Sequence, residues 1–160
     1  MDNQGLWELI EAARGQVRDP ADAEAVAARA ATLLSARPPG EIVAADEVLW
    51  GLMADSYRNP LWAAAYLVNG GCSDDGFEYF RGWLIMQGRE VYERVVADPD
   101  ALAGLCRHWG QGAQRPAGGV RGHAVYRLTR VPGLDRRGTP RRAFRSELPG
   151  AGPRMGLRLR

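Results

Sequence analysis

Apolar side chains recur at spacings of three and four residues throughout residues 5–105 of this chain. The first such stripe is formed by Leu6, Leu9, Ile10, Ala13 and Val17. This spacing marks one face of an amphipathic helix, whereas a half-buried strand alternates at every second residue. No stretch of the sequence shows sustained alternation of that kind. The spacing therefore predicts an all-α fold.

Capping residues, prolines and glycines divide this part of the chain into six or seven helices. An aspartate before proline favours a helix start, and glycine favours a helix exit because it readily adopts the left-handed conformation. The boundaries predicted in this way are Asp19-Pro20, Pro38–Gly40, Asn59-Pro60, Asn69–Gly71, Gly88 and Asp98–Asp100. We therefore predict one compact helical domain over residues 3–105.

The segment Leu61–Val68 is apolar on every side. A helix of this kind is typical of the middle of a core, so we predict that it is buried there. It is much shorter than the ~20 apolar residues that cross a bilayer, so no membrane association is expected. The aromatic residues on or beside the helical stripes are also expected in the core: Trp7, Trp50, Trp62, Phe77, Phe80 and Trp83.

Charge and composition change sharply near Leu105. Residues 1–105 contain 8 arginines and 17 acidic residues, which gives a net charge of −9. Residues 106–160 contain 13 arginines and 2 acidic residues, which gives +11, and lysine is absent from the whole chain. Residues 106–160 also show no pattern able to bury a core. We therefore expect an irregular arginine-rich tail after the helical domain.

Three hypotheses account for this tail. Lysine-free sequence rich in arginine, glycine and proline is what a GC-rich gene yields in another reading frame, so the first hypothesis is that residues 106–160 are out of frame. Translating the other two frames tests it. The second is that the arginines bind nucleic acid through its phosphates, which retention on heparin tests. The third is that the basic tail folds back on the acidic domain.

The segment Asn69–Ile85 carries the densest set of motifs. A helix that begins near Asp75 would be capped by Asp74 and Asp75 and closed by Glu78, as in a capping box. Arg81 would then pair with a carboxylate on the same helix face. This interpretation gives the charged residues of the segment a structural role.

Two chemical interpretations compete with helix capping. In the first, Asp74, Asp75 and Glu78 bind a divalent cation or act as acid and base, while Arg81 orients an anion. In the second, Cys72 is a reactive thiol before a helix start. Cys72 could also bind zinc together with Cys106, His108 and His123. The spacing of these four residues matches no recognised zinc-binding motif.

The interpretation that we favour is a binding surface on Asn69–Arg81, with no metal or cofactor and without catalysis. The candidate binding residues are Asn69, Cys72, Asp74, Asp75, Glu78 and Arg81. We expect the partner to be another protein, and nucleic acid only if residues 106–160 are in the native frame. Two cysteines and the absence of a signal segment predict a reducing cytoplasmic setting.

Three stretches of the sequence carry a resemblance to a known family. They are Trp7–Ile10, Trp62–Tyr66 and, above all, Asn69–Ile85. Over about residues 3–105 the chain resembles an uncharacterised bacterial family, the domain of unknown function number four-two-four-zero, which is frequent in actinomycetes. The resemblance implies a small, mostly helical cytoplasmic protein. It implies no activity, substrate or catalytic residue.

Overall fold

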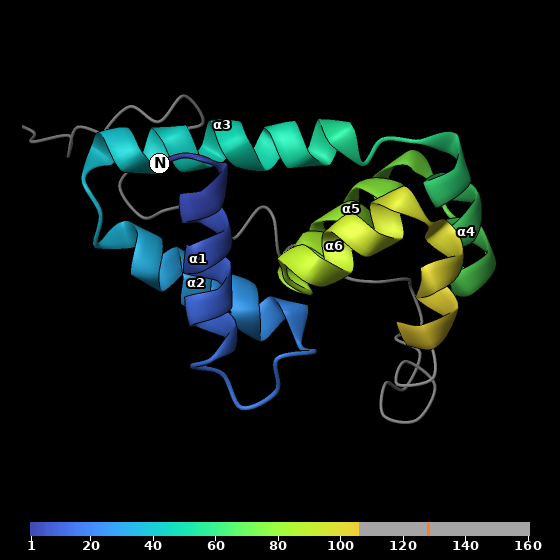
Figure 1. The fold of residues 1–160 in the computed structure, drawn as a ribbon, viewed down its shortest axis with the longest axis horizontal. Coiled ribbons are helices and arrows are strands. Elements are labelled where there is room, and N and C mark those ends of the chain that lie inside the picture. Colours follow the sequence, from blue (N-terminus) through green and yellow to red (C-terminus); the bar gives the residue numbers. More distant parts are fainter. Residues whose placement is uncertain (106–127, 129–160) are drawn as a thin grey trace, which may run out of the picture.

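The computed structural model describes residues 1–105 and Leu128, and every regular element in that part of the chain is a helix (Figure 1). The elements are α1 (Asn3–Arg14), α2 (Ala23–Ser35), α3 (Pro39–Asp55), α4 (Asn59–Asn69), α5 (Asp74–Met86), α6 (Arg89–Ala97) and a 3-10 helix, η1 (Pro99–Ala101). The predicted all-α class and the number of helices are confirmed for these residues. Three boundaries differ from the sequence prediction: α1 ends at Arg14 rather than Val17, α2 is capped by Asp22 rather than Asp19, and α3 begins at Pro39 rather than Glu41.

Helix α5 occupies the centre of the fold. It packs against α2, α3, α4 and α6. Its buried side chains include Phe77, Phe80 and Leu84. Helices α1 and α2 pack together at one end of the molecule, α4 lies at the other end, and α3 runs along one side (Figure 1). The central helix is therefore the one that begins in the segment Asn69–Ile85.

Helix α4 is an edge helix, so the prediction that Leu61–Val68 lies in the middle of the core is wrong. Within α4 only Leu61 and Ala65 are buried. Leu67 is 81% exposed and Tyr66 is 56% exposed. The physical reason is competition for the central position, because the phenylalanines of α5 bury far more apolar area than the alanines of α4.

The aromatic residues divide into buried, half-buried and exposed side chains. Trp7, Phe77 and Phe80 are buried, as predicted. Trp62 and Trp83 are half-buried and pack against the core. Trp50 is 42% exposed, so its assignment to the core is wrong. It lies on α3, whose buried face is formed by Ile42, Ala45, Leu49, Leu52 and Met53.

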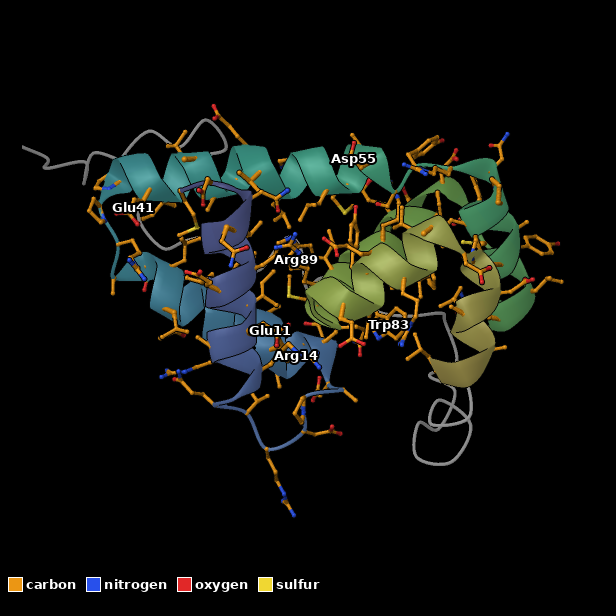
Figure 2. All side chains as sticks on the ribbon, viewed as in Figure 1. Glu11, Arg14, Glu41, Asp55, Trp83 and Arg89 are labelled. Atoms are coloured by element: carbon orange, nitrogen blue, oxygen red, sulfur yellow. The ribbon has the colours of Figure 1, made fainter. Side chains whose placement is uncertain are left out.

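The close approach of α1 to the turn between α5 and α6 fixes the position of the central helix. Arg14 donates to the carbonyl oxygen of Met86 at 2.8 Å and lies beside Glu11, with Nε 3.4 Å from Oε2 (Figure 2). A cation at this place neutralises the negative end of the α5 dipole. Gly88 follows with φ of 92°, and a side chain there would meet the Glu11 carboxylate. Its predicted role as a bend is confirmed.

Leu128 is the one described residue after Leu105, and it is part of the core. It is helical and 2% exposed, and it belongs to the same apolar cluster as the buried residues of α1 to α6. The apolar pattern of residues 106–160 gives no sign of this buried position. The remaining predictions for residues 106–160 lie outside the described residues.

Candidate functional site

The turn that joins α4 to α5 has a defined conformation. Gly70 adopts the left-handed conformation, with φ of 68°, and ends α4 as predicted. The N–H groups of Gly70 and Gly71 both donate to the carbonyl oxygen of Tyr66. The indole Nε1 of Trp62 donates to the carbonyl oxygen of Cys72 at 3.1 Å. These bonds tie the turn to the last two turns of α4.

The residue that caps α5 is Ser73, which the sequence analysis did not single out. Its hydroxyl oxygen accepts from the N–H of Gly76 at 3.1 Å. The capping box assigned to Asp75 and Glu78 is therefore wrong: Asp74 and Asp75 lie within the first turn, and Gly76, three residues after the cap, has no side chain to complete a box. The two aspartates are exposed, and both are favourable there because the positive end of the helix dipole attracts carboxylates.

The two polar residues that border this turn are partly buried. The amide Nδ2 of Asn69 donates to the carbonyl oxygen of Ala65 at 2.9 Å. Glu78 is half-buried and interacts electrostatically with Arg81. Among the described residues, no three histidine, cysteine, aspartate or glutamate side chains form a group that could hold a metal ion.

Arg81 lies beneath the surface rather than on it, with 7% of its area exposed. Its guanidinium donates to the carbonyl oxygens of Met53 and Phe77. It also contacts the rings of Tyr57 and Phe77, with Cζ 4.9 and 5.0 Å from the two ring centres. Burial lowers the pKa of Arg81, and the Glu78 carboxylate opposes that shift. The arginine caps the C-terminal end of α3, where a cation is favourable.

Two further side chains bind the same end of α3. The hydroxyl of Ser56 donates to the carbonyl oxygen of Leu52 at 2.8 Å, and the hydroxyl of Tyr92 donates to that oxygen at 2.6 Å. Ser56 and Tyr92 are both buried. Burial raises the pKa of Tyr92, so its phenol stays protonated and continues to donate at neutral pH. Together with Arg81 these groups form a structural polar cluster.

Cys72 is half-buried, and burial raises the pKa of its thiol. Its Sγ lies 3.7 Å from the carbonyl oxygen of Ser73 and donates to it. A thiolate, not a thiol, is the nucleophile in cysteine chemistry. The surroundings of Cys72 therefore favour the inert form. The other three zinc candidates, Cys106, His108 and His123, lie outside the described residues.

We expect Cys72 to react more slowly with iodoacetamide at neutral pH than an unperturbed thiol does. In a Cys106→Ser variant, the pH midpoint of alkylation should lie above the midpoint of the same variant unfolded in guanidinium chloride, because burial raises the pKa of the folded thiol. The rate should be measured by mass spectrometry across the alkaline range. A folded-state midpoint below the unfolded one would restore the reactive-thiol interpretation.

The outer face of α4 exposes two large apolar side chains, Tyr66 and Leu67, shortly before the turn. Its exposed positions recur at the spacing of one helix face, and they carry no charge: Asn59, Pro60, Ala63, Tyr66, Leu67 and Gly70. Two of the four large exposed apolar side chains among the described residues, Tyr66 and Leu67, belong to this face. We call these six residues the α4 face. Contiguous apolar surface of this kind marks binding sites more often than isolated exposed residues do.

Acidic side chains lie on both elements that pack against α4. Helix α5 carries Asp74 and Asp75 in its first turn, and η1 is preceded by Asp98 and contains Asp100. All four are exposed. Arg58, at the opposite end of α4, donates to the carbonyl oxygen of Asp55 at 2.9 Å. The α4 face is therefore bordered mainly by negative charge.

The surface predicted from the sequence, Asn69–Arg81, begins at the last residue of α4, so the α4 face adjoins it. The exposed apolar side chains lie just before it on α4. The signal was present in the sequence, since Pro60, Ala63, Tyr66 and Leu67 share one helix face opposite Leu61 and Ala65. Both faces are apolar, so hydropathy alone could not show which one faces solvent.

No helix among the described residues is long and apolar enough to cross a membrane.

Comparison with known proteins identifies one family. The model of the family described as "Protein of unknown function (DUF4240)" matches residues 1–117. The match extends beyond Leu105, where the composition changes, and it confirms the resemblance inferred from the sequence. No curated protein matches the chain, and no solved structure matches it.

Proposed function

Because the chain belongs to the DUF4240 family, whose description assigns no activity, we propose from its surface that it is a non-catalytic protein-interaction module. The binding surface in this proposal comprises the α4 face and the exposed acidic turn Ser73–Asp75. The observation that carries the proposal is the exposure of two neighbouring apolar side chains, Leu67 at 81% and Tyr66 at 56%. They lie on a helix whose opposite side, with Leu61 and Ala65, is buried in the core. We expect the module to act in the cytoplasm, because two cysteines indicate no reliance on disulfides.

The rigidity of this surface supports a binding role. The opposite side of α4 is held by Leu61 and Ala65 in the core, and Trp62 stacks on Phe77 with ring centres 4.9 Å apart. The turn after α4 is held by its hydrogen bonds to Tyr66 and Trp62. A partner would therefore meet a surface that is already ordered, which lowers the entropy cost of binding.

The catalytic alternative receives less support from the same residues. Arg81 caps α3 and is buried, so orienting a substrate anion at the surface would require it to leave the Met53 carbonyl. Asp74 and Asp75 occupy a helix start, where carboxylates are common for structural reasons. We therefore assign these acids to the rim of a binding surface rather than to acid–base chemistry.

The proposal is tested by affinity capture from the native lysate. The bait is the full chain in three forms: the wild type, Leu67→Glu and Ala12→Glu. Leu67→Glu places a charge in the α4 face, and Ala12→Glu makes the matched change at an exposed position of α1, at the other end of the molecule. We expect one stoichiometric protein to be retained by the wild type and by Ala12→Glu and to be lost with Leu67→Glu.

Thermal unfolding provides the control for this experiment. Both substituted positions are exposed, so both variants should unfold within a few degrees of the wild type, as surface substitutions usually do. The proposal fails if the wild type retains no specific protein, or if Leu67→Glu retains the same protein as Ala12→Glu does.

A further inference from the structure

We propose that the partner of the α4 face is a basic amphipathic segment of another protein, with apolar side chains on one side and arginines or lysines along its edges. This inference rests on the proposed function and names the chemistry of its partner. It follows from two properties of the surface: the α4 face is uncharged and mostly apolar, and two elements that pack against α4 carry exposed carboxylates.

The apolar part of the recognition comes from α4. Ala63, Tyr66 and Leu67 lie within one turn of each other on its outer side, at the spacing that an apolar helix stripe can match. Tyr66 offers a large ring at low cost in conformational entropy, which is typical of binding surfaces. An amphipathic segment that lays its apolar side chains along such a stripe is a recurrent mode of peptide recognition.

The polar part of the recognition comes from the carboxylates. Asp74 and Asp75 are the first two residues of α5, after the short turn that follows α4, and Asp100 lies on η1, which packs against α4. The described domain as a whole is acidic, because residues 1–105 have 17 acids and 8 arginines. Basic side chains flanking an apolar stripe would be attracted to this rim, and complementary charge sets partner choice and association rate.

The same charges disfavour a second copy of this face as the occupant. Two α4 faces packed with their helices parallel would bring Asp74 and Asp75 of one copy towards their equivalents in the other. Like charges across an interface oppose association, and the α4 face contains no cation to offset them. A basic partner removes that repulsion.

The experiment uses the full chain and two synthetic amphipathic peptides labelled with a fluorophore. One peptide carries leucines on one face and arginines at its edges, and the other carries glutamates in place of the arginines. Binding is measured by fluorescence anisotropy at low and high salt. We expect the arginine peptide to bind, its dissociation constant to rise with salt, and the glutamate peptide not to bind.

Matched variants locate the binding on the surface. Asp74→Asn with Asp75→Asn removes two charges at the rim, whereas Glu8→Gln with Glu47→Gln removes two exposed charges from α1 and α3. We expect the first pair to raise the dissociation constant of the arginine peptide by about threefold to tenfold, the effect of two exposed ion pairs. The second pair should change it little, and Leu67→Glu should abolish binding.

Four outcomes would overturn the inference. The glutamate peptide could bind as well as the arginine peptide, or the two double variants could have equal effects, and either result would remove the role of the acidic rim. The chain could instead self-associate in sedimentation experiments in a manner lost with Leu67→Glu, which would make a second copy the occupant. Capture of a partner that depends on Leu67 but not on Asp74 and Asp75 would leave the proposed function standing and refute only this inference.

Discussion

Replacing Leu128 by alanine should lower the free energy of unfolding by about 2–5 kcal/mol, the range measured for buried leucines in well-packed cores. Leu128 is 2% exposed and belongs to the main apolar cluster, so the shorter side chain loses buried area and leaves a cavity. Urea or guanidinium unfolding of the full chain, followed by circular dichroism, measures the change. The result matters because Leu128 lies beyond the change of composition near Leu105.

The matched control for this prediction is Leu67→Ala. Leu67 is 81% exposed, so the same truncation there should change the free energy of unfolding by less than about 0.5 kcal/mol. If both variants are equally stable, Leu128 contributes nothing to the folded domain. That result would favour the hypothesis that residues 106–160 are out of frame, because a chance sequence has no reason to complete a core.

Replacing Arg81 by alanine should destabilise the protein by about 2–4 kcal/mol, because it leaves a buried carbonyl oxygen without its donor and removes a packed side chain. The oxygen is that of Met53 in the last turn of α3, and the lost packing is against the rings of Tyr57 and Phe77. The free energy of unfolding measured in denaturant, with helical content followed by circular dichroism, tests this prediction.

Arg89→Ala provides the comparison for Arg81. Arg89 is exposed, and its Nε lies 2.7 Å from Oε1 of Glu93 on the same helix. Loss of such a surface ion pair should cost less than about 1 kcal/mol. A small effect at Arg81, equal to that at Arg89, would show that the guanidinium is not structural and would return it to the list of candidate ligand-binding groups.

Most helix boundaries could be predicted because their causes are local. Gly70 ends α4 in the left-handed conformation, Asp98 caps the last short helix through the N–H of Asp100, and Gly88 forms the bend between α5 and α6. Each depends on a few neighbouring residues and on backbone geometry. The starts of α2 and α5 are exceptions, because neighbouring polar residues compete there: Asp22 rather than Asp19 caps α2, and Ser73 takes the position assigned to Asp75.

The candidate surface could be predicted only in part. The acidic turn at Asp74 and Asp75 is exposed, which its charge and its place before a helix already indicated. Arg81 could not be placed from sequence, because its partner is the carbonyl of Met53 on another helix. An arginine near three carboxylates suggests a surface ion pair until the tertiary structure brings a helix end to it.

The helical class, the family and several helix ends follow from the sequence, since apolar spacing and capping act over a few residues. Only the tertiary structure decided that α5 rather than α4 is central, that Leu128 completes the core, and that one apolar face of α4 remains exposed. Hydropathy reports how strongly a side chain avoids water, and it does so equally for both faces of an apolar helix. Which face is buried depends on the bulk of competing helices elsewhere in the chain, and that competition is settled only when they pack together.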